Sequence, residues 1–160
     1  MEPAGAQFRE AIRINPSHAL AHRSLGLALR ESGDLPAAAA ELRLAVAQLP
    51  EDAEGHHILG TVLLKSNDVN GAIEEFRRAV ALNPELAQAR ASLAQALQRA
   101  GQKEDAQKEL AELEKINLGV ANEGRAMILV ESAEGHINKG EQSVRSWGIT
   151  RRGYAEPWLH

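Results

Sequence analysis

The chain has 160 residues, of which 44 % are hydrophobic and 3 % aromatic. Alanine and leucine, which are strong helix formers, supply most of the apolar content, so we expect an all-α protein. A net charge of −4 argues against a nucleic-acid-binding domain. The absence of cysteine excludes disulfides and thiolate chemistry. No apolar run reaches the ~18 residues of a membrane span.

The predicted helices follow one another in chain order with short turns between them. They occupy residues 2–14, 17–31, 35–48, 53–65, 69–81, 87–99 and 103–116. Prolines recur 34 residues apart at Pro16, Pro50 and Pro84. The pairs Gly33-Asp34, Asn67-Asp68 and Gly101-Gln102 have the same spacing. Because independent series share one period, we predict a tandem repeat of two helices.

Each recurring residue type has a physical role in a helical hairpin. Gly33, Asn67 and Gly101 suit the left-handed conformation that ends a helix. The aspartates that follow, Asp34 and Asp68, suit the N-cap of the next helix. Each proline ends a second helix, because it disfavours helical geometry in the residue before it.

Small residues recur at two further positions of the period, one in the first helix and one in the second. They are Gly26, Gly60 and Ala94, and Ala38, Ala72 and Ala106. We expect them to let the helices of a hairpin approach closely, while leucine and phenylalanine at helical spacing fill the space between hairpins.

Two motifs in each repeat resemble those of the tetratricopeptide repeat family, whose pattern is W-x2-L-G-x2-Y, then A-x3-F-x2-A, then proline. The matching segments are His22-x2-Leu25-Gly26-x2-Leu29 with Ala38-x3-Leu42-x2-Ala45, His56-x2-Leu59-Gly60-x2-Leu63 with Ala72-x3-Phe76-x2-Ala79, and Arg90-x2-Leu93-Ala94-x2-Leu97 with Ala106-x3-Leu110-x2-Leu113. Histidine or arginine replaces the usual tryptophan, and Leu118 stands where the proline of the third repeat is expected. The resemblance covers about residues 2–118.

The resemblance implies a right-handed superhelical solenoid of antiparallel helical hairpins. The array would occupy residues 1–118, as a half repeat at 2–16 and full repeats at 19–52, 53–86 and 87–118. The half repeat is a second helix with no first helix before it. Because a solenoid buries its faces only by stacking neighbours, we expect a longer array or a cover at that end.

The period slips after Leu118. The next match to the glycine series is Gly140-Glu141, which lies 39 residues beyond Gly101. Residues 119–142 are therefore predicted to be a displaced or extended helical segment. Either a separate helix covers 126–139, or the helix at 103–116 continues through the insertion.

Glycine positions and amino-acid composition indicate what structure to expect after Leu118. Gly119, Gly124 and Asn117 favour the separate helix, because glycine is costly inside a helix. Residues 143–160 hold both tryptophans and the only tyrosine, show no helical period and are predicted to be an irregular or disordered tail. The alternative is a peptide that caps the last hairpin.

The resemblance implies that partners bind in a concave groove lined by the first helix of each hairpin. Its usual positions fall on Leu20, Arg23, Leu27, Arg30, Glu54, His57, Thr61, Leu64, Lys65, Gln88, Ala91, Gln95, Gln98 and Arg99. This mixed, partly basic surface would suit an extended or helical peptide with some acidic residues. The alternative is that single members of the set are merely solvated positions.

One subfamily clamps the C-terminal carboxylate of chaperones with lysines, asparagines and an arginine. The corresponding positions here are Arg23, Leu27, Ile58, Gln88 and Ser92. Only Arg23 keeps the charge, so chaperone-tail binding is excluded.

Histidines raise the question of a metal site. His18 and His22 are four residues apart on a helix, a spacing that can hold a divalent ion, and His56 lies one period after His22. No cysteine or nearby carboxylate pair completes a ligand set, so we predict neither metal nor cofactor. No nucleophile elbow, phosphate-binding glycine loop or metalloprotease motif occurs, which argues against an enzyme.

Three functions remain open. The main hypothesis is a protein–protein interaction scaffold that binds an unknown protein or peptide in the groove. The alternatives are self-assembly through the exposed terminal helices, namely the unpaired first helix and residues 119–139, which could form a homodimer, and a recruiting domain of a larger enzyme. We expect no nucleic-acid or membrane partner, and a cytoplasmic location because Met1 to Glu10 lack the apolar core of a signal peptide.

Overall fold

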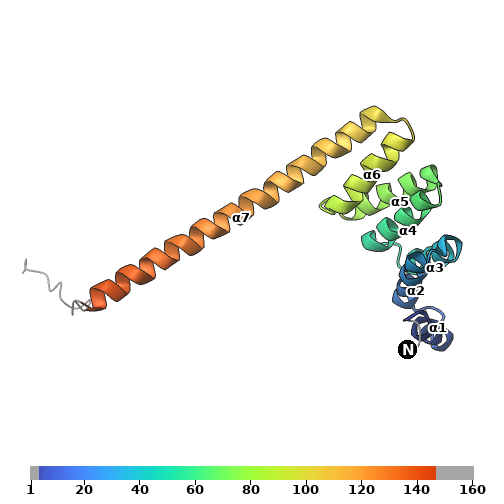
Figure 1. The fold of residues 1–160 in the computed structure, drawn as a ribbon, viewed down its shortest axis with the longest axis horizontal. Coiled ribbons are helices and arrows are strands. Elements are labelled where there is room, and N and C mark those ends of the chain that lie inside the picture. Colours follow the sequence, from blue (N-terminus) through green and yellow to red (C-terminus); the bar gives the residue numbers. More distant parts are fainter. Residues whose placement is uncertain (1–3, 147–160) are drawn as a thin grey trace, which may run out of the picture. The chain divides into compact units, whose positions relative to one another are not determined.

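The structure is a computed structural model that describes residues 4–146, and all regular secondary structure among them is α-helical (Figure 1). The helices are α1 (Ala4–Ile14), α2 (Ala19–Ser32), α3 (Leu35–Gln48), α4 (Ala53–Lys65), α5 (Val69–Leu82), α6 (Ala87–Arg99) and α7 (Lys103–Ser146). The chain divides into two compact units, Met1–Asn117 and Leu118–His160. No helix in the described part of the chain is both long and apolar enough to cross a bilayer.

The first unit is a stack of helical hairpins. Helix α2 packs on α3, and α4 packs on α5, while α1, α3 and α5 each pack on the helix that follows them. The first helices also contact one another, α2 with α4 and α4 with α6. These contacts between successive repeats confirm the predicted all-α solenoid.

The turns inside the hairpins have the predicted geometry. Gly33, Asn67 and Gly101 have φ angles of 88°, 66° and 78°. The side chains of Asp34 and Asp68 each accept a hydrogen bond from the backbone N–H three residues ahead, at 3.2 and 3.0 Å. The left-handed residue therefore ends the first helix and the aspartate caps the second, as predicted.

The start of α2 differs from the prediction by two residues. We predicted a helix from residue 17, but α2 begins at Ala19. His18 is its N-cap, and Nδ1 of His18 accepts a hydrogen bond from the backbone N–H of Ala21 at 3.2 Å. A side-chain acceptor at that point satisfies an N–H group that has no partner within the helix.

The core lies between the two helices of each hairpin and between neighbouring hairpins. Leu42 and Phe76 have no exposed surface. A Cβ atom on Gly26 would lie 2.6 Å from Cγ of Leu42, and one on Gly60 would lie 2.7 Å from two ring atoms of Phe76. The prediction that these glycines permit close helix approach is therefore confirmed.

Helix α7 follows the alternative in which the helix at 103–116 continues through the insertion. We predicted that the helix ends at 116 and that Gly119 and Gly124 favour a separate helix, but α7 runs without a break to Ser146. With Leu118 in place of proline, nothing removes a backbone hydrogen bond at the insertion, and Gly119 and Gly124 together cost only about 2 kcal/mol. Residues 143–146 are helical rather than irregular, and the rest of the predicted tail, 147–160, lies outside the described residues.

Candidate functional site

Two hollows lie between successive first helices. The α2–α4 hollow has a volume of about 470 Å³. Five of the predicted groove residues line it, namely Leu27, Arg30, Glu54, His57 and Gln88. They come from α2, α4 and α6, so the stacking of three repeats brings together residues up to 61 positions apart in the chain (88 minus 27).

The α4–α6 hollow lies one repeat further along. Its volume is about 370 Å³, and five more predicted residues line it: Thr61, Leu64, Lys65, Gln95 and Arg99. Leu64 is 8 % exposed, so it forms part of the floor, whereas Lys65, Gln95 and Arg99 are exposed.

The remaining four predicted residues line neither hollow. Leu20, Ala91 and Gln98 are exposed. Arg23 instead forms ion pairs between neighbouring hairpins, 2.9 Å from Asp52 and 3.3 Å from Glu54. Its guanidinium is already engaged in joining the hairpins.

Sequence reasoning missed five residues that line these hollows. Ala53, Ile58, Asn83 and Leu86 line the α2–α4 hollow, and Asn67 lines the α4–α6 hollow. Asn67, Asn83 and Leu86 lie in turns or at a helix cap, whereas the prediction considered only first helices. The signal that could have found them is the adjacency of these turns to the first helices in a stacked repeat.

Among the histidines whose side chains the structure describes, only His57 lines either hollow. Its Nε2 lies 3.1 Å from the hydroxyl of Ser92, and its ring lies 5.7 Å from that of Phe76. Burial lowers the pKa of His57, the charge of Glu54 opposes that shift, and the charge of Arg30 adds to it. The imidazole is therefore neutral at neutral pH, and the positive charge of the hollow comes from arginine.

Three basic side chains give the hollows their charge. Arg30, Lys65 and Arg99 each lie in the last turn of their helix. Among residues 5–132, whose side chains the structure describes, none of the three has an ion-pair partner. They remain able to pair with carboxylates from outside the chain.

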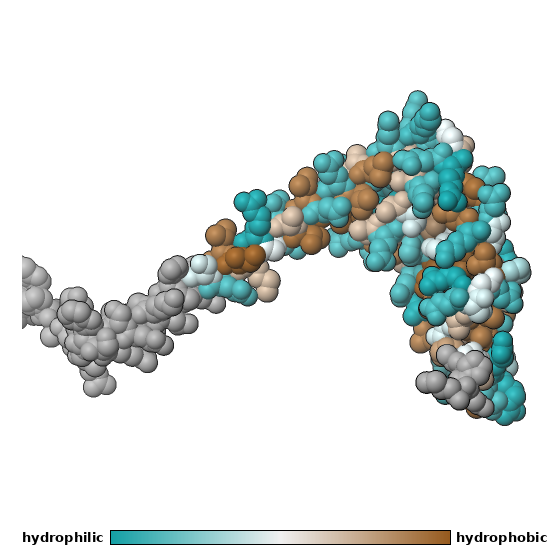
Figure 2. Space-filling view, in the orientation of Figure 1, coloured by the Kyte–Doolittle hydropathy of each residue, from teal (hydrophilic) through white to brown (hydrophobic). Residues whose placement is uncertain are grey.

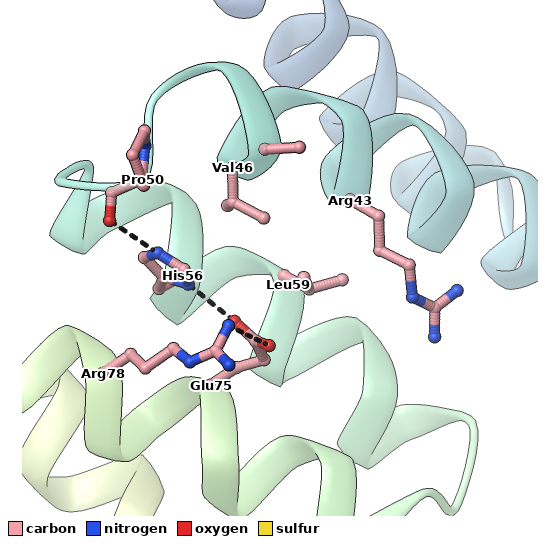
Figure 3. A pocket seen from close by; sticks show the side chains of 8 residues that line it. Arg43, Val46, Pro50, His56, Leu59, Glu75 and Arg78 are labelled. Atoms are coloured by element: carbon pink, nitrogen blue, oxygen red, sulfur yellow. Dashed lines mark hydrogen bonds and ion pairs between the residues drawn. The ribbon is translucent and has the colours of Figure 1, made fainter.

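The histidines considered for a metal site make other bonds. Both ring nitrogens of His22 and of His56 lie within hydrogen-bonding distance of protein oxygens. His56 lines a third hollow, the α3–α5 hollow of about 500 Å³, with Glu75, Arg43 and Arg78 (Figure 3). Within the described residues, no three His, Asp or Glu side chains are grouped so that they could hold a metal ion.

Comparisons with known proteins agree with this architecture. Residues 30–152 match the family described as Cytochrome c-type biogenesis protein H TPR domain, and residues 4–53 match Tetratricopeptide repeat. The crystal structure of MamA has a TM-score of 0.72 at 22 % identity, covering 74 % of this chain and 70 % of that chain. MamA from position 41 to its end, from Desulfovibrio magneticus RS-1, has a TM-score of 0.68 at 22 % identity, with coverages of 72 % and 66 %. At this identity the likeness concerns the fold alone, and no curated protein matches the sequence.

Proposed function

The chain belongs to the tetratricopeptide repeat family, and we propose that it is a scaffold that binds an acidic segment of another protein along α2, α4 and α6. Membership of this family supports a protein-interaction role. The finer proposal rests on the α2–α4 and α4–α6 hollows, which together hold ten of the fourteen predicted groove residues (five in each). Catalysis within this chain forms no part of the proposal.

The charge of the hollows argues for an acidic partner. Arg30 lies in one hollow, and Lys65 and Arg99 lie in the other. A partner carboxylate in each hollow would form a charge-assisted hydrogen bond with a cation that has no partner among residues 5–132. Because the hollows lie one repeat apart, a segment with two acidic positions, spaced to match, fits both.

Apolar and polar neighbours would add selectivity. Leu27 and Leu86 offer an apolar wall in the α2–α4 hollow, and Thr61 and Gln95 offer hydrogen bonds in the other. Interfaces of this kind take orientation from polar groups and affinity from buried apolar side chains. We therefore expect the bound segment to alternate acidic and apolar residues.

The test uses two triple variants of equal charge. In one, Arg30, Lys65 and Arg99 become alanine. The control variant changes Arg9, Arg43 and Arg77, which are exposed on the second helices and recur at the same period. Peptides selected from a random displayed library with the natural chain as bait should be rich in Asp and Glu.

These peptides should bind the variant with alanine at Arg30, Lys65 and Arg99 at least about tenfold more weakly than the natural chain, because each lost charge pair weakens a desolvated contact. The control variant should bind them as the natural chain does. Selected peptides without acidic residues, or equal binding by both variants, would contradict the proposal.

A second candidate function is self-association through the predicted segment 119–139. Val120, Met127 and Val130 in α7 are 65 %, 66 % and 57 % exposed. Figure 2 shows such hydrophobic side chains along α7. Their spacing of seven and then three residues is that of a coiled-coil seam, and a self-complementary seam suits a second copy of the same helix.

The same helix provides the control. Ile128 and Leu129 are 66 % and 70 % exposed but lie off this seam. If the natural chain sediments at twice its 17.3 kDa mass, Met127→Gln with Val130→Gln should return it to the monomer, while Ile128→Gln with Leu129→Gln should not. A natural chain that is monomeric at all concentrations rules this candidate out.

A further inference from the structure

A buried basic side chain joins three parts of the first full repeat. His22 is the fourth residue of α2 and is 5 % exposed. Its Nδ1 lies 2.7 Å from a carboxylate oxygen of Glu41 in α3, and its Nε2 lies 3.0 Å from the backbone carbonyl oxygen of Pro16. One ring therefore links the loop that enters the hairpin to both of its helices.

The second repeat has the same arrangement. His56 is the fourth residue of α4 and is 3 % exposed. Its Nδ1 lies 2.6 Å from Glu75 in α5, and its Nε2 lies 3.0 Å from the carbonyl oxygen of Pro50 (Figure 3). In both repeats the partners lie 19 residues after the histidine and six before it.

The third repeat replaces the histidine with arginine and keeps both partners. Nε of Arg90 donates to the carbonyl oxygen of Pro84 at 3.0 Å, and a terminal nitrogen of Arg90 donates to Glu109 at 2.8 Å. The separations of six and 19 residues are unchanged. A side chain that is always protonated therefore makes the same pair of bonds.

The hydrogen count of the two histidine sites follows from their partners. A proline carbonyl can only accept, so Nε2 must carry a hydrogen. The other ring nitrogen faces a carboxylate oxygen, and that contact also needs one hydrogen. Whether this hydrogen sits on the imidazole or on the carboxyl, the intact site holds one proton more than a neutral histidine beside an ionised glutamate.

We propose that His22 and His56 are proton-dependent latches, which hold the first two full hairpins to the loops that enter them, and that Arg90 is the permanent form of the same latch. Loss of the proton leaves two acceptors facing each other and releases one of the two bonds. The first two hairpins loosen, whereas the third does not.

The groups around the first latch favour its protonated form. At the first latch Glu41 is the charged partner, and burial alone lowers the pKa of His22, but the hydrogen bonds to Glu41 and Pro16 and the charge of Glu41 raise it on balance. At the second, Arg78 lies 3.4 Å from the other oxygen of Glu75, and Arg43 lines the same hollow. Glu75 therefore contacts both Arg78 and the ring of His56.

The sign of the pH dependence follows from the extra proton. At His22, below pH 6.5, the ordinary pKa of histidine, folded and unfolded chains both hold this proton, and its contribution to stability is fully present. As pH rises, the unfolded chain loses the proton first, so stability falls until the folded chain loses it too. The loop released at Pro50 also carries Asp52, which forms an ion pair with Arg23. Loosening of this loop would therefore also weaken the ion pair to α2.

The test compares the urea midpoint of the natural chain with that of a His22→Arg, His56→Arg variant, from about pH 6 to about pH 9, where free histidine loses its proton. The midpoint of the natural chain should fall across this range, and the fall should shrink to less than half in the variant. Other titrating groups are shared by the two chains and cancel. Arg90→His should make the fall steeper. Equal slopes in all three chains would overturn the proposal.

A measurement on the natural chain covers the case in which the arginine variant does not fold. Amide hydrogen exchange, corrected for the intrinsic pH dependence of the rate, should show α2 to α5 losing protection as pH rises while α6 keeps it. Equal loss in α2 to α5 and in α6 would overturn the proposal as well. Neither outcome depends on a binding partner, so this test is independent of the groove.

Discussion

Gly60 lies inside a helix, where a methyl group alone would favour helix formation, but its close packing against Phe76 should make that methyl group destabilising. In Gly60→Ala the new Cβ would lie 2.7 Å from Cδ1 and Cε1 of Phe76. Carbon atoms in contact prefer about 3.5–4.0 Å, so the atoms must separate by about 0.8 Å or more. Phe76 has no exposed surface, and a packed interior cannot yield that distance without strain.

The size of the effect follows from two opposing terms. Overpacking of a core costs about 1–3 kcal/mol, while replacing glycine with alanine inside a helix gains about 1 kcal/mol. Gly60→Ala should therefore lower the free energy of unfolding by about 0–2 kcal/mol. Gly124→Ala in α7, where nothing lies within 4 Å of the new Cβ, keeps only the gain of about 1 kcal/mol.

The assay is urea unfolding of the array, with the third repeat as an internal control. Ala94 already stands at the position of Gly60, and Leu110 stands at that of Phe76 and is 41 % exposed. Combining Gly60→Ala with Phe76→Leu installs the pair of the third repeat, so the double variant should be more stable than the sum of the single effects predicts. If Gly60→Ala alone raised stability, the reasoning about close packing would be refuted.

Three further predictions concern charge and capping. Burial lowers the pKa of His57, so the unfolded chain takes up this proton before the folded chain does. The urea midpoint should therefore fall as pH drops below 6.5. His57→Gln should make that fall smaller. Asp68→Ala should lower thermal stability by about 1 kcal/mol through loss of its capping bond, a cost that an unchanged melting curve would disprove. Arg23→Ala should lower the free energy of unfolding by about 0.5–1 kcal/mol, and by less in high salt. A double-mutant cycle with Asp52→Ala should give a coupling free energy for the Arg23–Asp52 ion pair. A coupling free energy of zero would show that the ion pair contributes nothing.

The fourteen predicted groove residues illustrate how far prediction from the sequence reached. Ten of the residues that it selected line two hollows, because the register of a first helix follows from the spacing of its apolar positions. Arg23 could not be distinguished from the others, because its partner Asp52 belongs to the next hairpin. The sequence also marked His22 and His56 as packing substitutes for tryptophan, but the proline carbonyl and the glutamate that complete each set are contacts across elements.

The sequence by itself determined the period, the hairpin turns and the caps, since φ preferences at Gly33 or Asn67 and capping by Asp34 or Asp68 are local properties of a few neighbouring residues. It did not determine where α7 ends, because the four glycines of this helix weaken it by amounts comparable to the gain from its other residues. Only the tertiary structure decided which side chains meet: Gly60 with Phe76, His56 with Glu75, and Arg23 with Asp52. Each pair joins separate helices or loops, and the distance between them is set by the stacking of whole repeats.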